Sequence, residues 1–409
     1  MKALILSVGN EVLSGKTINT NASFIAIELE KIGVDVIKVV TIGDNKEMLI
    51  SEINSFKTSD IDILVSTGGL GPTHDDFTKE VLYEAIGLKL VQRKEPLDLL
   101  NKYFKGNYTE CNLKQTYYPE DAYLIPNNRG TAMGAISEVD NKIYSILVGP
   151  PFEMKPMVTD YLVPYIKNKT NVQMVLKEFI VMGIGESQVE EILKDYYKKY
   201  PNVETNPYCS IGKVRYQINA KVQHIEEFNK AISEFVTILD KYIISDKNEE
   251  IEDKVFEELI RLNYHISFSE SCTGGMLSSK MINVDGASKV IDRSLVTYSD
   301  DAKIELLGVN KATIDAYDIV SEEVAIEMAK GIKKYANSSV GVGVTGYAGP
   351  GGGTEDIPVG TVCFAICVDD IIFSKTCYYK TSRNVLRERV TMQIFYNLYD
   401  ILKNYKINN

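Results

Sequence analysis

The chain has 409 residues, more than a single hydrophobic core usually supports, so we expect two or three domains. Its composition is that of a soluble globular protein, 44% hydrophobic and 25% charged, and 56 acidic against 45 basic residues give a net charge of −11. That balance, without a conspicuous run of Lys or Arg, argues against nonspecific binding of nucleic acid.

Targeting signals are not expected. No apolar run approaches the roughly 20 residues that span a bilayer. Residues 1–6 lead into a short apolar strand that is too brief for a signal peptide. The six cysteines lack CxxC spacing, so neither a disulfide framework nor a zinc site is predicted. We therefore expect a cytoplasmic protein with no membrane and no nucleic-acid partner.

Strand and helix patterns alternate through the first zone, residues 1–168. An apolar run ends at Gly9, as a buried parallel strand should, and the helix after it ends at Gly33, a good left-handed terminator. Strict alternation predicts a parallel sheet with helices on both faces, and ligands bind beyond the carboxyl ends of such strands. The strands are predicted at 3–8, 34–40, 61–67 and 143–148, and the helices at 21–32, 46–56 and up to 86.

A glycine-rich loop follows the third of these strands, at the ligand-binding edge of the predicted sheet. It contains Gly68, Gly69 and Gly71, and Asp75 and Asp76 come shortly after. Backbone amides of such a loop can hold phosphate, and carboxylates can hold a divalent cation. The alternative is that the two aspartates cap the helix that follows the loop.

The second zone, residues 172–247, differs in character. Strands are predicted at 176–182 and 213–220, and helices at 187–197 and 225–242. The zone contains no glycine-rich phosphate loop and no cluster of metal ligands. We interpret it as a small α+β spacer or dimerisation module.

The third zone, residues 250–409, is again predicted to be α/β. Helices are predicted at 254–263, 276–282, 300–307, 322–335 and 383–402, and strands at 265–268, 294–298, 339–344 and 360–368. A second glycine-rich loop, residues 346–353, follows the third of these strands, and it could equally be a simple mobile turn.

Ser271 lies where the first strand of this zone turns into a helix, and Gly274 and Gly275 follow it. Unpaired amides at a helix start can hold a phosphate or an oxyanion. A serine nucleophile needs a base, and none of the three histidines is set as in a Ser-His-Asp triad. Lys303, in the first turn of a helix, is the candidate base, because the helix start, and burial if the side chain is buried, would favour its neutral form, whereas Asp300 and Asp301 would oppose that shift. Tyr298 could relay a proton or orient the lysine.

Each of these residues also has an ordinary structural interpretation. Ser271 alone would stabilise the start of its own helix. Lys303 alone would be a solvated helix lysine, and Tyr298 a core tyrosine. Considered singly, these residues support only an α/β nucleotide-binding enzyme.

The motifs taken together resemble the CinA (competence/damage-inducible protein) family over essentially the whole chain. In the third zone the resemblance rests on the segments E-S-C-T-G-G at 270–275, V-T-Y-S at 296–299 with Lys303, V-S-E-E at 320–323, V-T-G-Y-A-G-P-G-G-G at 344–353 and P-V-G-T at 358–361. In the first zone it rests on Glu11, N-T-N at 19–21, Gly43-Asp44, residues 67–76 and G-P-P-F-E-M at 149–154.

For the third zone the resemblance implies a nicotinamide mononucleotide deamidase without a cofactor. Ser271 would be the nucleophile, acting with Lys303 and Tyr298, and the products would be nicotinate mononucleotide and ammonia. Substrate-binding positions would be Thr273, Gly274, Gly275, Thr345, Gly349, Gly351, Gly352, Arg383 and Arg387, with one of the two arginines on the phosphate.

For the first zone the resemblance implies a three-layer molybdopterin-binding-like fold with metal-dependent ADP-ribose pyrophosphatase activity. Asp44, Asp75 and Asp76 would hold Mg, Mn or Co. Asn10 and Met133 depart from the family pattern, at positions where a small hydroxyl residue and a proline are usual. The second zone resembles the family's KH-like domain but lacks a GxxG loop, so RNA binding is not implied. A homodimer is implied.

Two alternatives of other classes stay open. One is a molybdopterin-binding or transferring protein, which leaves Ser271 unexplained. The other is a non-catalytic competence factor that acts through protein contacts.

Overall fold

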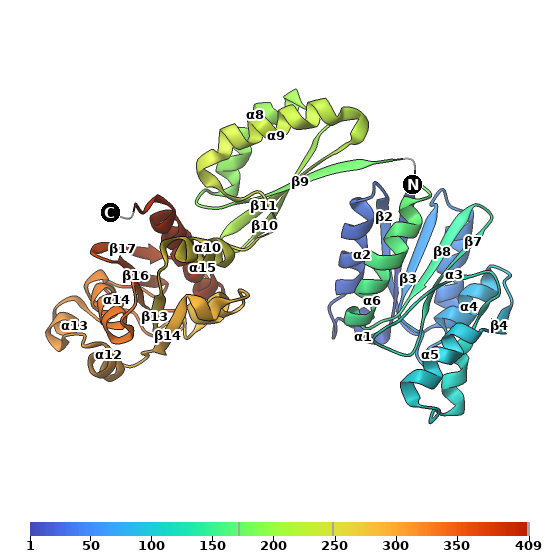
Figure 1. Ribbon diagram of the computed structural model, residues 1–409, viewed down its shortest axis with the longest axis horizontal. Coiled ribbons are helices and arrows are strands. Elements are labelled where there is room, and N and C mark those ends of the chain that lie inside the picture. Colours follow the sequence, from blue (N-terminus) through green and yellow to red (C-terminus); the bar gives the residue numbers. More distant parts are fainter. Residues whose placement is uncertain (171, 248, 407–409) are drawn as a thin grey trace. The chain divides into compact units, whose positions relative to one another are not determined.

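A computed structural model describes residues 1–170, 172–247 and 249–406 (Figure 1). The chain forms two compact units. The first contains Met1–Val175 with Ala220–Ile225, and the second contains Leu176–Asn219 with Glu226–Asn409. None of the described helices has the length and apolar character needed to cross a membrane.

The first unit is built on a six-stranded sheet of order β2-β1-β3-β8-β7-β6. Its first four strands are parallel, and β7 and β6 each run antiparallel to the strand before them in that order. Apolar side chains of the central strands are buried on both faces, as expected of parallel strands between helical layers. The strands are β1 (Lys2–Val8), β2 (Asp35–Ile42), β3 (Ile63–Thr67), β6 (Tyr123–Ile125), β7 (Gly134–Val139) and β8 (Lys142–Leu147).

Helices cover both faces of this sheet, which confirms the predicted three-layer architecture (Figure 1). On one face α2 packs against α6, and on the other α3 packs against α4. Their bounds are α2 (Thr20–Glu30), α3 (Lys46–Thr58), α4 (Thr78–Ala85) and α6 (Pro151–Met157). The sequence patterns did not predict β6 and β7 of this sheet, nor α1 (Asn10–Leu13), α5 (Lys94–Phe104) and the antiparallel pair β4 (Leu90–Gln92) and β5 (Tyr117–Pro119).

The middle of the chain forms a four-stranded sheet of order β10-β11-β9-β12. Two long helices lie on it, and their aromatic side chains pack with those of the strands: Phe179 contacts Phe235, which also contacts Tyr196 and Tyr216. The elements are β9 (Met174–Val181), α8 (Glu186–Lys199), β10 (Glu204–Ser210), β11 (Lys213–Lys221), α9 (Ile225–Leu239) and β12 (Ile243–Ser245).

The C-terminal part is a five-stranded sheet of order β14-β13-β15-β16-β17. The first three strands are parallel, whereas β16 and β17 are antiparallel to their neighbours, so this sheet is mixed. The strands are β13 (Ile266–Glu270), β14 (Ile291–Val296), β15 (Val340–Gly346), β16 (Thr361–Val368) and β17 (Ile371–Tyr378), the last of which was not predicted.

Helices cover this sheet on both faces as well. Helices α10, α11 and α15 share one apolar cluster with the strands. Helices α12 and α13 pack against α14, which itself packs on β13, β15 and β16. Ile180 and Ile244 of the middle sheet, and Met182 directly after β9, belong to the cluster of α10, α11 and α15. The helices are α10 (Ile251–Leu262), α11 (Met276–Ile282), α12 (Asp300–Leu307), α13 (Lys311–Tyr317), α14 (Glu322–Ala336) and α15 (Arg383–Asn404).

Candidate active site

Ser271 occupies the turn between β13 and α11. Its backbone N–H donates to the Val344 carbonyl of the neighbouring strand at 3.0 Å, so the end of β15 fixes the start of the turn. Gly274 and Gly275 have φ values of 59° and 91°, which favour glycine, and they allow the chain to reverse before α11 begins. Ser271 is therefore held at the carboxyl ends of two parallel strands.

The start of α11 is capped by Glu270 and not by Ser271. The buried Glu270 carboxylate accepts from the backbone N–H groups of Gly275, Leu277 and Ser278, at 3.0, 3.1 and 2.9 Å, and from the Ser278 hydroxyl at 2.7 Å. The interpretation of Ser271 as a residue that stabilises the start of its own helix is therefore wrong, because its hydroxyl takes no part in the cap.

The same contacts correct the expectation that these helix-start amides are free to hold a phosphate or an oxyanion. Glu270 already supplies the anion that the unpaired N–H groups of a helix start attract. Three donors are therefore occupied from within the chain.

Lys303 is buried, with 1% of its surface exposed, and its Nζ lies 3.3 Å from Ser271 Oγ. It is therefore not a solvated helix lysine. Burial lowers the pKa of this amine from its ordinary value near 10.5, and the Asp300 carboxylate opposes that shift only in part. The predicted pair of Ser271 and Lys303 is thus brought together from the turn after β13 and the first turn of α12, which lie 32 residues apart along the chain.

Four oxygen atoms lie within hydrogen-bond distance of Lys303 Nζ. The backbone carbonyls of Thr297 and Tyr298 accept from it at 3.1 Å, and the Ser271 hydroxyl oxygen accepts at 3.3 Å. The Ser299 carbonyl, at 3.5 Å, is the most distant acceptor.

Helix α15 connects three segments around this pair. Arg387 donates to the Thr273 carbonyl at 2.6 Å. Arg383 donates to the Gly349 carbonyl at 2.8 Å and to the Tyr298 hydroxyl at 3.1 Å. The Tyr298 side chain is 61% exposed, and the contact of this residue with Lys303 runs through its backbone carbonyl and not its hydroxyl.

Two buried hydroxyl groups near the pair have no hydrogen-bond partner within the described chain: those of Thr273 and Thr297. The Nε of Arg387 is in the same condition. Buried polar groups are normally paired, so these three atoms are exceptions to the usual pairing. Thr345, by contrast, donates its hydroxyl to the Ile319 carbonyl at 2.8 Å. Gly351 and Gly352 lie in the loop that follows Gly349.

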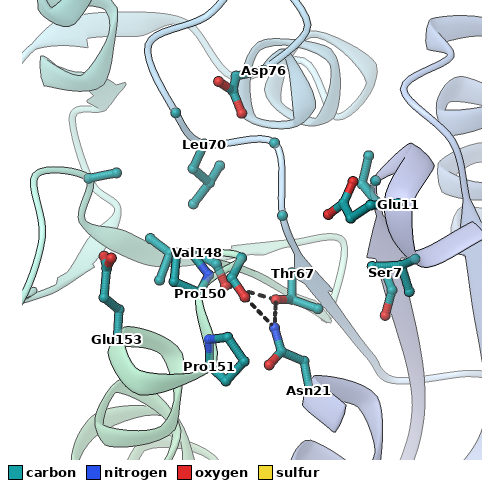
Figure 2. Close-up of a pocket in the computed structure, with 18 of the residues that line it drawn as sticks. Ser7, Glu11, Asn21, Thr67, Leu70, Asp76, Val148, Pro150, Pro151 and Glu153 are labelled. Atoms are coloured by element: carbon teal, nitrogen blue, oxygen red, sulfur yellow. Dashed lines mark hydrogen bonds between the residues drawn. The ribbon is translucent and has the colours of Figure 1, made fainter. Parts of the chain in front are cut away.

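A pocket of about 480 Å³ lies at the carboxyl ends of the parallel strands in the first unit (Figure 2). Its floor is tied together by Asn21, whose amide donates to the Thr67 hydroxyl at 2.9 Å and to the Gly149 carbonyl at 2.7 Å. The hydroxyl of Thr67 donates in turn to the Val148 carbonyl at 2.8 Å. The predicted loop residues Gly68, Gly69 and Gly71 line this pocket.

The pocket is strongly acidic. Five carboxylates line it, and among the described residues of its wall none is Lys, Arg or His. The five are Glu11, Asp44, Asp75, Asp76 and Glu153. A bare phosphate compound would therefore meet repulsion from every charged side chain around it.

The three predicted metal ligands line the pocket, but they do not form a ready metal centre. Within the described ranges, no group of three or more His, Cys, Asp or Glu is placed to hold an ion. Asp44 accepts from the Asn10 N–H at 3.1 Å, and both Asp75 and Asp76 accept from the Thr73 hydroxyl. The hydrogen bond from Thr73 lowers the pKa of Asp75. The assignment of these three carboxylates as ligands of a divalent cation stays a prediction.

The two aspartates do not cap α4 either. That helix begins at Thr78, and no side chain caps it. Asp76 instead accepts the Thr73 N–H at 3.0 Å within the loop. Local loop contacts therefore occupy both carboxylates.

Three family models match the chain in order. A probable molybdopterin binding domain matches residues 4–168, a damage-inducible protein CinA KH domain matches 176–245, and a CinA C-terminal domain matches 248–402. A putative competence-damage inducible protein of Clostridium perfringens is 41% identical over 403 residues, which cover 96% of this chain and 97% of that one. The chain belongs to the CinA family.

Two further relatives are similar to this chain over different lengths. The putative competence-damage inducible protein of Clostridioides difficile is 39% identical over 413 residues, covering 97% of this chain and 98% of that one. The crystal structure of a competence or damage-inducible protein from Enterobacter asburiae is 31% identical and covers 37% of this chain and 96% of that chain, with a TM-score of 0.37.

The two departures from the CinA pattern have local structural roles. The side-chain oxygen of Asn10 accepts from the Asp44 N–H at 3.2 Å, so the residue closes a turn at the pocket. Met133 is buried in the core, and its carbonyl accepts from Tyr118 at 2.7 Å. Neither position places a group in the 480 Å³ pocket.

Sequence reasoning missed the role of Glu270 and the unpartnered hydroxyl of Thr297. The motif at 270–275 contains Glu270 but does not show its capping role. A glutamate five residues before the glycine that precedes a helix can reach the amides of that helix. The sequence around Thr297 does not indicate its role, because the lack of a hydrogen-bond partner for its hydroxyl depends on burial against other segments of the chain.

Proposed function

We propose that the C-terminal site of this protein hydrolyses the carboxamide of nicotinamide mononucleotide, with Ser271 as nucleophile and Lys303 as general base. The observation that carries the proposal is the 3.3 Å contact between the Ser271 hydroxyl and a buried amine whose pKa is lowered by burial. A nucleophilic hydroxyl requires an adjacent base, and this lysine stands in that position.

The reaction would proceed in two halves. Lys303 takes the proton of Ser271 while Oγ attacks the carboxamide carbon, and the resulting ammonium returns that proton to the departing nitrogen, which leaves as ammonia. Water then attacks the acyl-enzyme, again with Lys303 as base, and releases nicotinate mononucleotide and free Ser271. Each step uses only protein groups and water.

Several groups support a phosphorylated substrate at this site. Arg383 and Arg387 lie one helical turn apart on α15, and their contacts at Gly349 and Thr273 lead to the segments around Ser271. The Nε of Arg387 and the hydroxyls of Thr273 and Thr297 are buried and unpartnered within the described chain, so a substrate would pair with them only after the segments around them shift.

The direct test is release of ammonia from nicotinamide mononucleotide by the full chain. Ser271→Ala should lower kcat by roughly 10⁴-fold or more, because the nucleophile and its base act as a unit. Ser279→Ala is the matched control, since that serine lies exposed on α11 and should keep the wild-type rate. Ammonia release that persists in Ser271→Ala would refute the assignment.

A second candidate function belongs to the first unit, because its 480 Å³ pocket with a glycine-rich loop has the size of a nucleotide site. The proposal is hydrolysis of the ADP-ribose pyrophosphate. Incubation with ADP-ribose, with and without Mg, Mn or Co, followed by separation of products tests it. A pterin that copurifies with the protein would favour a binding role for this pocket, and a specific protein partner without turnover of either nucleotide would favour a non-catalytic role.

A further inference from the structure

Asp318, at the end of α13, has a backbone conformation that side chains rarely adopt. Its φ is 72° and its ψ is 157°. The non-glycine residues Lys105, Asn263 and Asn337, which also end helices with positive φ, have ψ values between 36° and 44° and so lie in the ordinary left-handed region. The region of Asp318 is essentially restricted to glycine, and such strain persists only where the surroundings enforce it.

The surroundings that enforce it begin at α14. The Ser321 hydroxyl donates to the Asp318 carbonyl at 2.9 Å. Ser321 Oγ also accepts from the Val324 N–H at 3.3 Å and so caps α14. The Asp318 carboxylate itself accepts from the Val320 N–H at 3.0 Å. The turn at 318–321 is thus bonded to the first turn of that helix.

Helix α14 in turn lies unusually close to β15. A Cβ on Gly341 would come within 2.2 Å of the Ala329 carbonyl oxygen, and one on Gly343 within 2.4 Å of that of Ala325. Only glycine permits this approach. The close packing holds α14 on the sheet. The turn at 318–321 is bonded to the first turn of α14, so it is held in place as well.

The strained turn reaches the glycine-rich loop through two hydrogen bonds. The Tyr347 hydroxyl donates to the Asp318 carboxylate at 2.8 Å, and the Thr345 hydroxyl donates to the Ile319 carbonyl at 2.8 Å. Thr345 directly follows Val344, whose carbonyl binds the Ser271 N–H. The anchored segment is thus one residue away from the strand position that fixes the nucleophile.

We propose that Asp318 is a positioning residue, which holds Tyr347 and the start of the glycine-rich loop in the geometry that binds substrate beside Ser271. This inference rests on the proposed deamidase function. The backbone strain is retained because a glycine at this position would relieve it but would lose the carboxylate that binds Tyr347. Asp318 acts through Tyr347 and contacts no reacting atom.

Three variants of the full chain test this role. Asp318→Gly relieves the strain and removes the carboxylate, so the KM for nicotinamide mononucleotide should rise about tenfold while kcat stays within threefold and the Tm does not fall. Tyr347→Phe should raise KM similarly, and the double variant should add little, because both changes break one contact. Asp318→Asn keeps an oxygen acceptor at the same place and should retain most of the affinity.

Hydrogen exchange gives a readout that does not depend on turnover. In Asp318→Gly the Tyr347 and Gly360 amides, which donate to Thr361 and Tyr347, should exchange at least about tenfold faster than in the wild type. Asp315→Asn, an exposed change on the same helix, is the control.

The two proposals fail in different ways. Wild-type protein that releases no ammonia would overturn the deamidase function, while the exchange result would still decide whether Asp318 orders the loop. Unchanged exchange and unchanged KM in Asp318→Gly would overturn the positioning role. A fall in Tm with no change in KM would also overturn it, because that is what a purely structural residue would produce.

Discussion

The two candidate sites lie at equivalent places, at the carboxyl ends of parallel strands beside a glycine-rich loop, yet their chemistry is opposite. The C-terminal site pairs a buried amine with a hydroxyl. The N-terminal pocket contains five carboxylates and, among its described lining residues, no Lys, Arg or His. Shared topology therefore decides where a ligand site forms, whereas the side chains that converge there decide which reaction it can support.

The amine distinguishes the two sites, so its removal should have the largest effect. Lys303→Met keeps a long apolar side chain but removes the base, and kcat/KM for nicotinamide mononucleotide should fall by roughly 10³-fold. Lys311→Met is the control, because that lysine is exposed on α13 and paired with Asp315. Near-wild-type activity in Lys303→Met would contradict the role of Lys303 as base, and with it the chemical difference between the C-terminal site and the N-terminal pocket.

The pH profile sharpens the same contrast. Only neutral Lys303 can act as base, so kcat/KM should rise about tenfold per pH unit below the pKa of Lys303 and then level off. Because burial lowers that pKa, the plateau should begin below pH 10.5. A rate that falls with rising pH over this range would contradict the base assignment.

Stability should follow with a definite sign. Between the lowered pKa of folded Lys303 and the unfolded value near 10.5, the unfolded chain binds more protons, so this residue makes the free energy of unfolding rise with pH. Below both values its contribution no longer changes with pH. Denaturant unfolding of wild type and Lys303→Met over this range measures the difference.

The Glu270 carboxylate of the C-terminal site is buried and caps a helix, whereas the Asp75 and Asp76 carboxylates of the N-terminal pocket accept from Thr73 in their own loop. Glu270→Ala removes four hydrogen bonds to the start of α11, so exchange of the Gly275, Leu277 and Ser278 amides should accelerate at least about tenfold. Glu270→Gln keeps one strong acceptor and should give a smaller change. Equal exchange in all three proteins would show that the cap does not stabilise the turn that holds Ser271.

The smallest effect is expected in the acidic pocket. Asp75→Asn removes one negative charge, so ADP-ribose should bind roughly two- to fivefold more tightly in the presence of a chelator. Asp98→Asn, an exposed change of the same charge on α5, should leave the affinity unchanged. Calorimetric titration measures both, and weaker binding by Asp75→Asn would show that the carboxylate assists the ligand instead of repelling it.

Much of the fold could be predicted because its signals are local. Buried strands such as β1 and β3 are continuous apolar runs, and the helices between them show a clear period. The strands β4, β5 and β6 were missed because each has only three residues, too few for a period to show. The antiparallel β17 was missed because its exposed edge residues obscure the strand pattern.

The site shows the same division. Ser271, Lys303 and the glycines could be named from their motifs, but the assignment of the base depended on burial, which no local pattern reports. Tyr298 illustrates the limit, since its hydroxyl meets Arg383 from a helix that begins 85 residues later, while its carbonyl meets Lys303.

The sequence by itself determined the alternation of the main strands and helices, the turns that glycine requires and the residue types capable of acyl transfer. Only the tertiary structure decided that Lys303 is buried beside Ser271 and that the Glu270 carboxylate accepts from the amides at the start of α11. The same holds for Asp75 and Asp76, which accept from Thr73. The physical reason is that hydrogen-bond partners and solvent exposure depend on segments distant in the chain, and these in turn set protonation and charge.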